Sequence, residues 1–454
     1  MSIQNAAQFP QIEKIIQQPF LAPYVETLSR QFVSRIVKNI VAEYKQECID
    51  AGGFSHFSSD RLYSLIELSC KTFQRQRLRK VINATGVVVH TNLGRSPIDP
   101  ELWLSVTELN TGYCNLELDL HTGKRGKRKG MLPRLMHELV KGEDTLVVNN
   151  NAAAIYLMLH ELAKGKEVIV SRGEQVQIGG GFRIPDILAQ SGAKLVEVGA
   201  TNITTLEDYL DAVTDNTAMV LVVHTSNYKI RGFTQSPDLS ELAKYLPDHV
   251  ILAVDQGSGM TTESFPDELS VSHYLRAGVD LVCFSGDKII GGPQSGFITG
   301  KQMLIERMEK NPMMRAFRPG RIIYSLLEEL LVRKLNADNA GRGIAESRFR
   351  RPESEQRAMA EKLAALSPDQ LSVVPSQMTI GGGSLPDENF PSWSLQVHMS
   401  QSPDRLLNIM RSWPIPVIGM VKHDKVLLSM ATLSSKELEY VATQMKELLE
   451  VCIL

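Results

Sequence analysis

The chain has 454 residues, of which 43% are hydrophobic and 22% are charged, and its formal net charge is −2 at pH 7. A chain of this length can bury a large core and is expected to hold two or three domains. The small net charge argues against a generally basic coat for nucleic acid and leaves only a local basic patch open.

The cysteines indicate a reducing compartment, and the hydropathy of the chain indicates neither a signal peptide nor a membrane span. The five cysteines are widely spaced and form no C-x-x-C motif, so neither a disulfide framework nor a zinc site is predicted. The N-terminus lacks a basic stretch followed by an apolar core, and no apolar run approaches the length of a membrane span. We therefore expect a cytoplasmic protein with no signal peptide and no membrane partner.

Residues 1–78 are expected to form a helical domain, because apolar residues such as Phe32, Ile36 and Ile40 recur at helical spacing. Residues 1–80 hold 11 basic and 7 acidic residues, a net charge of +4 (11 − 7). A basic helical module of this kind can hold an RNA backbone. A solvated face or a subunit contact explains the same charge equally well.

Residues 79–335 alternate between strand and helix patterns, which predicts an α/β domain with a doubly wound, mainly parallel sheet. The expected strands cover residues 145–149, 167–171, 194–198, 219–224, 250–255 and 280–284. Residues 336–454 change character and are expected to form a smaller α+β domain that begins with a charged, glycine-containing connector at 338–352.

A helix start after the first of these strands is the candidate phosphate site. Asn150, Asn151 and Ala152 open a helix rich in small residues, whose first-turn N–H groups can receive an anion. Close packing against the sheet would favour the same small residues. His224, at the end of another strand, could contact a bound ring, although a structural histidine is the more common interpretation of such a position.

Lys288 follows the strand at 280–284 and precedes a Gly-Gly-Pro turn, which places it on a loop where open α/β sheets bind ligands. A lysine desolvated there can lose its proton and attack an aldehyde, as pyridoxal 5′-phosphate (PLP) chemistry requires. Asp255 ends the neighbouring expected strand and could keep the pyridine nitrogen of PLP protonated. Ser285 could add a hydroxyl group to the phosphate site. The alternatives are a solvated lysine and an Asp that caps a helix or binds a metal.

Three arginines surround this predicted core. Arg95 follows a glycine-containing loop, while Arg315 and Arg318 are spaced three apart beyond the helix that is expected to start near Gln302. Forked guanidinium groups at this spacing suit a phosphate-like oxyanion. The basic run at 124–129 is either a solvated loop or a surface that faces phosphate or RNA.

Several uncommon strings occur in a fixed order along the chain. They are residues 82–95 (INATGVVVHTNLGR), 148–154 (VNNNAAA), 171–174 (SRGE), 180–186 (GGFRIPD), 224–228 (HTSNY), 284–294 (FSGDKIIGGPQ) and 381–386 (GGGSLP). Together they resemble bacterial selenocysteine synthases, the L-seryl-tRNA(Sec) selenium transferase family, over nearly the whole chain. The sequence departs from the family pattern at Gln256, at Ile203 and at 319–321.

The resemblance implies a fold-type I PLP-dependent transferase in which Lys288 forms the Schiff base and an N-terminal domain binds seryl-tRNA(Sec). It matches Arg95, Arg315 and Arg318 to the family's phosphate-binding arginines. In the mechanism that we expect, these arginines hold the phosphate of selenophosphate, Lys288 is the candidate base and Asp287 is a proton relay. The expected reaction removes the serine hydroxyl group and adds selenium. A homo-oligomer is also implied, a ring of dimers that forms a homodecamer, with no role for DNA.

Two other functions compete with this expectation. A PLP-dependent ammonia lyase that acts on a small phosphorylated amino acid would use the same lysine, aspartate and arginines, but it would not need the basic N-terminal residues. A non-catalytic tRNA-binding protein would not need Lys288 and Asp255.

Overall fold

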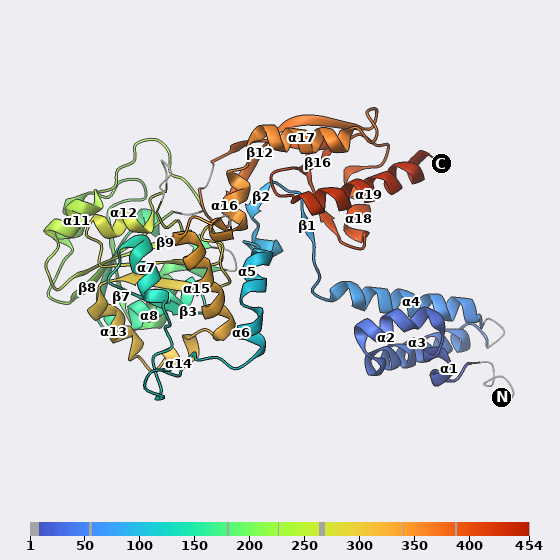
Figure 1. Cartoon of the computed structure of the whole chain (residues 1–454), viewed down its shortest axis with the longest axis horizontal. Helices are drawn as coiled ribbons and strands as arrows, with labels where there is room; N and C mark the ends of the chain where they lie inside the picture. The colour runs from blue at the N-terminus through green and yellow to red at the C-terminus, as the bar shows by residue number, and fades with distance from the viewer. Residues whose placement is uncertain are drawn as a thin grey trace. The chain divides into compact units, whose positions relative to one another are not determined.

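Residues 1–80 and 81–454 form two units of the computed structural model. The structure describes residues 9–53, 57–178, 181–225, 227–262, 268–338, 340–385 and 388–453, and its elements are shown in Figure 1. Gly180, Ser226 and Pro386, which belong to the strings noted above, lie outside these ranges. Within the ranges, no helix has the length and hydrophobicity that crossing a membrane requires.

The N-terminal unit is helical, as the sequence predicts. Its helices are α1 (Ile12–Ile16), α2 (Ala22–Leu28), α3 (Arg30–Asp50) and α4 (Ser59–Gln76). Val33 and Val37 of α3 are buried in one hydrophobic cluster with Leu62 and Ile66 of α4, the apolar stripes that helical spacing predicts. The Ser58 side chain caps α4 by accepting a hydrogen bond from the N–H of Arg61, at 3.3 Å.

A seven-stranded sheet organises the first part of the second unit. Its strands, in spatial order, are β3 (Asp144–Val148), β11 (Gly296–Gly300), β10 (Leu281–Ser285), β9 (Ile251–Gly257), β8 (Thr217–Val223), β4 (Glu167–Ser171) and β7 (Lys194–Val198). In this sheet β11 runs in the direction opposite to the other six strands. The prediction of a mainly parallel sheet is therefore confirmed.

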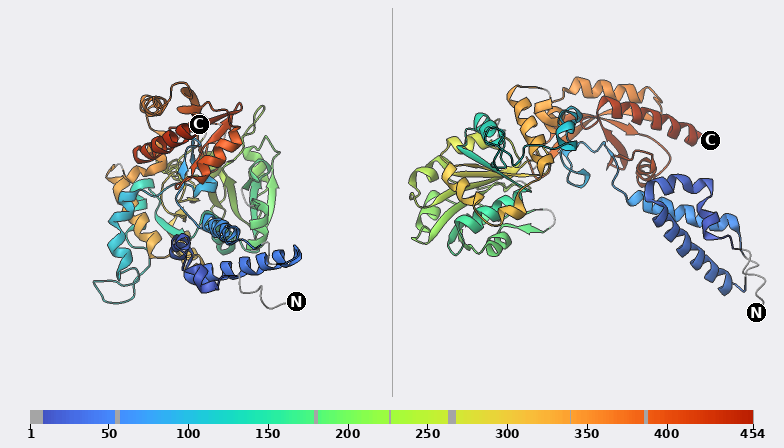
Figure 2. Two further views of the ribbon diagram at one scale, coloured as in Figure 1. Left: turned by 90° about the vertical axis from the view of Figure 1, so that its right-hand side faces the viewer. Right: turned by 60° about the horizontal axis from the view of Figure 1, so that its bottom comes forward.

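Both faces of this sheet are covered by helices, which the views in Figure 2 show. Alternate strand residues point to opposite faces, so Val282 and Phe284 belong to one hydrophobic cluster while Leu281 and Cys283 belong to the other. The first face packs against α7 (Leu132–Val140), α10 (Leu206–Asp211), α11 (Leu239–Tyr245), α12 (Val271–Arg276) and α15 (Arg321–Leu335). The second packs against α8 (Asn151–Leu162), α9 (Ile184–Ser191) and α13 (Gln302–Glu309).

Shorter elements connect these layers. They are α5 (Pro100–Ser105), α6 (Thr107–Thr111), α14 (Met314–Phe317) and the hairpin of β5 (Gln177–Ile178) with β6 (Phe182–Arg183). The loop before α7 contains the basic run, in which Arg125 and Arg128 both pair with Glu117, while Lys129 pairs with Asp144 at 2.8 Å. Much of the positive charge of that run is therefore neutralised by ion pairs within the protein.

The C-terminal part builds a second sheet that also takes in residues from the start of the unit. Its order is β15 (Met420–Lys422), β16 (Lys425–Ser429), β13 (Phe390–Val397), β12 (Leu371–Gly381) and β2 (Val87–Val89). A further pair joins β1 (Ile82–Asn83) to β14 (Val417–Ile418). The helices α16 (Gly343–Phe349), α17 (Glu353–Ala364), α18 (Pro403–Ser412) and α19 (Ser435–Ile453) complete this α+β part. The connector expected at 338–352 thus contains a helix, α16.

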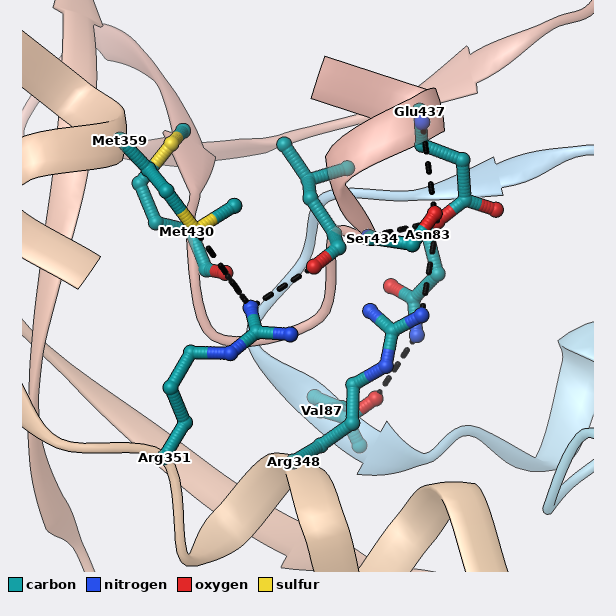
Figure 3. Close-up of polar contacts among 9 residues, drawn as sticks. Asn83, Val87, Arg348, Arg351, Met359, Met430, Ser434 and Glu437 are labelled. Carbon is teal, nitrogen blue, oxygen red and sulfur yellow. Dashed lines mark hydrogen bonds and ion pairs between the residues drawn. The ribbon is translucent and has the colours of Figure 1, made fainter. Parts of the chain in front are cut away.

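Two arginines tie this connector to the C-terminal part (Figure 3). Arg351 donates hydrogen bonds from Nη1 to the carbonyl oxygens of Met430, at 3.0 Å, and Leu433, at 2.7 Å. Arg348 lies 3.4 Å from Glu437, and its burial lowers the guanidinium pKa to about 10. Glu437 and Ser434 form the capping box at the start of α19 that the sequence predicts.

Candidate active site

The loop that carries Lys288 follows directly from the buried strand β10. It is closed by backbone hydrogen bonds from the N–H of Gly286 to Ser295 O and from the N–H of Gly292 to Gly286 O, both 2.8 Å. A Cβ atom on Gly286 would lie 2.0 Å from Oγ of Ser295, so only glycine fits there. Lys288 itself is only 7% exposed, so the alternative of a solvated lysine is wrong.

Asp255 lies beside this loop, on the adjacent parallel strand β9, where it is paired in register with Cys283 of β10. A Cβ atom placed on Gly257 would be 3.9 Å from Oδ1 of Asp255 and 4.0 Å from Nζ of Lys288. The carboxylate and the amine therefore border the same small space. This is the arrangement that two adjacent strand ends predict.

Burial shifts the pKa values of both Lys288 and Asp255. Burial lowers the pKa of the Lys288 amine, and the nearby Asp255 carboxylate opposes this change. Burial also raises the pKa of Asp255, against the hydrogen bond from Asn151 and the charge of Lys288. A lysine whose pKa is lowered provides more of the neutral amine that attacks a carbonyl carbon.

The start of α8, which follows β3, reaches the same sheet edge. Asn150 caps the helix by accepting the N–H of Ala153 at 2.9 Å, while Asn151 donates from Nδ2 to Oδ1 of Asp255 at 2.8 Å. The two asparagine side chains thus bond within the protein. Asn150 accepts the N–H of Ala153 with its side chain and that of Ala154 with its carbonyl oxygen. Within the described residues, the N–H groups of Asn151 and Ala152 have no acceptor and are available to an anion.

Ser285 and His224 complete the sheet edge. Ser285 is the last residue of β10 and is buried. His224 follows β8, is half-buried, and donates its backbone N–H to the carbonyl oxygen of Asp255 at 3.0 Å. The structure therefore brings Asp255, Ser285, His224 and Lys288 together at one edge.

Arg95 contacts this group through Asp287, the residue before Lys288. Its Nη1 donates to Oδ2 of Asp287 at 2.7 Å, and its charge is close enough to influence Lys288. Arg95 has a φ of +63°, an uncommon conformation for a residue with a side chain, and its N–H closes the loop onto His90 O. Asp287 is 6% exposed.

The other two arginines lie farther along the edge. Arg315 is on α14 and Arg318 follows it; the carbonyl oxygens of Ala316 and Phe317 accept hydrogen bonds from Asn149, just before α8. Arg318 lies 4.0 Å from Glu117. In the described part of the chain, no hydrogen bond or ion pair joins Arg315 or Arg318 to Lys288.

Two carboxyl groups with raised pKa values, the half-buried Glu174 and the buried Glu268, were not predicted from the sequence. Glu174 follows β4 and accepts the N–H of Val223 at 2.9 Å, and burial raises its pKa to about 8. Glu268 is 1% exposed and close enough to Lys288 and His224 for electrostatic interaction. Glu174 could have been flagged from its place in the SRGE string, whereas nothing around Glu268 marks it in the sequence.

The polar groups around Lys288 fit a polar, phosphate-bearing group such as PLP. Several buried side-chain atoms around it have no hydrogen-bond partner within the described chain: Oδ1 of Asn151, Oδ1 of Asp287, Oγ of Ser96 and Nδ1 of His90. Unpaired buried polar atoms are costly, so such atoms gathered around one lysine indicate a ligand or water site.

Comparison with known proteins decides the family. A family model described as SelA, L-seryl-tRNA selenium transferase, matches residues 81–434. The chain belongs to this family. It is 36% identical over 442 residues to the L-seryl-tRNA(Sec) selenium transferase of Carboxydothermus hydrogenoformans, with 95% of both chains covered. It is 38% identical over 459 residues to that of Alkaliphilus metalliredigens, with 97% of this chain and 98% of the relative covered.

Among solved structures, this family member resembles D-glucosaminate-6-phosphate ammonia-lyase with a TM-score of 0.59 and 19% identity, over 84% of this chain and 99% of the other. At that identity the likeness concerns the fold alone. The fold-type I class expected from the sequence is confirmed, and so is the resemblance to the selenium transferase family.

Proposed function

We propose that this protein converts seryl-tRNA(Sec) to selenocysteinyl-tRNA(Sec) with PLP and selenophosphate. The observation that carries the proposal is the buried pair of Lys288 and Asp255 at the sheet edge of a chain that belongs to the selenium transferase family. Because its substrate is an aminoacyl-tRNA, we place the protein in the cytoplasm.

Lys288 would hold PLP through a Schiff base. The N–H groups of Asn151 and Ala152, with the Ser285 hydroxyl group, would hold its phosphate, and Asp255 would face the ring nitrogen. PLP bound in this way supplies an electron sink for the negative charge that develops when the seryl Cα loses its proton. Lys288 is the candidate carrier of that proton, because its amine is buried and readily neutral.

Asp287 is the candidate residue for the proton that leaves with the serine hydroxyl group. Its Oδ2 is held by Arg95, whereas its buried Oδ1 has no partner within the described chain and is open to a group of the substrate. Arg95, Arg315 and Arg318 are the candidates for the phosphate of selenophosphate, since guanidinium groups donate two parallel hydrogen bonds to such an oxyanion.

The N-terminal unit would bind the tRNA body and the chain would act as a ring of dimers. The basic end of α4 and the N-terminal unit's own hydrophobic cluster suit a separate RNA-binding module.

Exposed apolar side chains suit a contact with another subunit. They lie on and near α5 and include Trp103, Leu104 and Tyr113.

The test uses purified protein loaded with PLP, seryl-tRNA(Sec) carrying labelled serine, and selenophosphate. We expect labelled selenocysteine on the tRNA after hydrolysis of the ester, and none with Lys288→Ala. Labelled pyruvate and free ammonia without incorporation of selenium would contradict the proposal and indicate a lyase. Unchanged seryl-tRNA, bound but not converted, would indicate a tRNA-binding protein.

A further inference from the structure

A buried carboxyl group, Glu268, lies between the lysine loop and a turn of the C-terminal part. Its Oε2 accepts a hydrogen bond from the N–H of Leu385 at 3.0 Å, and its Oε1 accepts one from Nε2 of Gln256 at 3.4 Å. Both partners are buried, with Gln256 at 0% and Leu385 at 2% exposure. Since buried polar groups are costly without partners, each oxygen atom holds a defined neighbour in place.

On the large-sheet side, Gln256 links Glu268 to the lysine loop. Its Oε1 accepts the N–H of Gly259 at 2.8 Å, and its Nε2 donates to Oγ of Ser258 at 2.5 Å. The carbonyl oxygen of Ser258 then accepts the N–H of Ile289, the residue after Lys288, at 3.0 Å. A continuous set of hydrogen bonds therefore runs from Glu268 to the backbone beside the lysine.

On the other side, Leu385 ends a turn that the chain adopts only under constraint. Gly381, Gly382 and Gly383 all have positive φ, and so does Leu385, at +48°. A side chain in this conformation costs energy, which the surrounding contacts must offset. The hydrogen bond to Glu268 is the contact that fixes the N–H of that strained residue.

The same turn is attached to the lysine loop by a second route. Gly381 pairs with Val89, and a Cβ atom on Gly382 would lie 2.6 Å from Cγ1 of Val89. Val89 precedes the loop whose Arg95 pairs with Asp287, next to Lys288. The turn is thus held against the lysine loop from two sides, and Glu268 supplies one of them.

We propose that Glu268 is a positioning residue that fixes the turn 381–385 against the Lys288 loop and so holds that loop in place. The inference deepens the proposed function, because the position of the loop matters for reaction only if Lys288 carries PLP. Glu268 acts through the backbone of Leu385 and through Gln256, so it is not assigned a step at the reacting atoms.

Two substitutions at this position separate positioning from simple packing. Glu268→Ala removes both acceptor oxygens, whereas Glu268→Gln keeps an oxygen that can accept the N–H of Leu385. The matched control is Gln356→Ala, which removes another fully buried acceptor, the partner of Ser392 at 2.7 Å, from a contact between α17 and β13.

The measurement is hydrogen–deuterium exchange of the full-length protein by mass spectrometry, followed in the peptide that contains Leu385. We expect exchange there to rise roughly tenfold in Glu268→Ala and to stay near the wild-type rate in Glu268→Gln and Gln356→Ala. With seryl-tRNA(Sec) we expect Glu268→Ala to lower kcat about tenfold or more with little change in KM for the tRNA, and Glu268→Gln to restore most of it.

Unchanged exchange in Glu268→Ala would overturn the proposal. An equal rise in Gln356→Ala would also overturn it, since it would show general loosening of the C-terminal part. Wild-type protein that fails to convert seryl-tRNA(Sec) would refute the proposed function, while the exchange comparison would still decide the role of Glu268.

Discussion

Cys283 lies directly opposite Asp255 across the β9–β10 pair, with its Sγ 3.6 Å from Oδ1 of the carboxyl group. Burial raises the pKa of the Cys283 thiol, so the thiol stays protonated and can donate to the carboxylate. Asn151 donates to the same oxygen from the start of α8. Asp255 is therefore oriented by both β10 and α8.

Replacement of Lys288 by alanine should abolish covalent attachment of PLP and leave the fold intact. Since the lysine is buried, the loss of packing is offset by removal of a desolvated amine, and we expect the free energy of unfolding to change by less than about 2 kcal/mol. Borohydride reduction followed by peptide mass spectrometry should find the adduct on Lys288 in wild type and in the surface control Lys301→Ala. An adduct on another lysine would contradict the assignment.

Arg318→Lys should weaken the use of selenophosphate, because a point charge cannot reproduce the paired donors of guanidinium. We expect KM for selenophosphate to rise roughly tenfold while the absorbance of bound PLP stays unchanged. Arg307→Lys, on the exposed side of α13, is the control. If donor kinetics of Arg318→Lys match those of wild type, Arg318 does not bind the donor phosphate.

Deletion of residues 1–80 should leave a folded protein that loads PLP and binds tRNA(Sec) poorly, because the N-terminal unit has its own hydrophobic cluster. In the full chain, replacing the exposed Arg75 and Arg79 by glutamine should weaken binding and reduce its salt slope by about 1–2. Arg77 is left unchanged, since it donates to Thr27 O at 2.6 Å.

Filter binding over a salt series provides the measurement for these variants. Equal affinity and equal salt slope in full-length and truncated protein would assign the N-terminal unit to assembly instead.

Glu174 should make the fold less stable as pH rises. Its folded-state pKa of about 8 lies above its ordinary value of 4.5, so the folded state retains a proton that the unfolded state has lost. The free energy of unfolding should therefore fall by up to roughly 1.4 kcal/mol per pH unit between these two values. Urea unfolding at several pH values should show a shallower fall in Glu174→Gln, and no such effect for the exposed control Glu207→Gln.

Arg351→Ala should destabilise the C-terminal part by about 2–4 kcal/mol, because the carbonyl oxygens of Met430 and Leu433 would lose a charged donor. Arg350→Ala, at the neighbouring position with a side chain 40% exposed, should cost less than about 1 kcal/mol. Thermal unfolding of both variants checks the difference. Similar losses in the two variants would argue against a specific role for Arg351.

Six of the seven strands of the large sheet could be predicted, because most are apolar runs followed by polar residues that mark the ligand edge, whereas β11, a short segment between two glycines, was missed. Strand β12 was not predicted, since its residues alternate only weakly and Pro375 interrupts the pattern. Its stability comes from pairing with β13 and β2, which local sequence does not reveal.

The candidate site, like the fold, could be predicted only in part. Lys288 and Asp255 follow strands, so their meeting follows from topology. The bond from Asn151 to Asp255 and the contacts of Glu268 depend on side-chain packing between distant segments, and no spacing rule predicts them.

Strand β2 is synthesised long before the strand of the C-terminal sheet with which it pairs. Thr379 pairs with Val87, 292 positions earlier (379 − 87), so the early segment leaves the ribosome long before its partner exists. Contacts this distant in sequence form slowly and leave strand edges open meanwhile. A fragment that begins at residue 336 would lack β1 and β2 and would expose the edge of β12, which is a template for aggregation. Expression of the C-terminal part alone therefore requires residues 81–89 to be supplied, on the same chain or as a separate peptide.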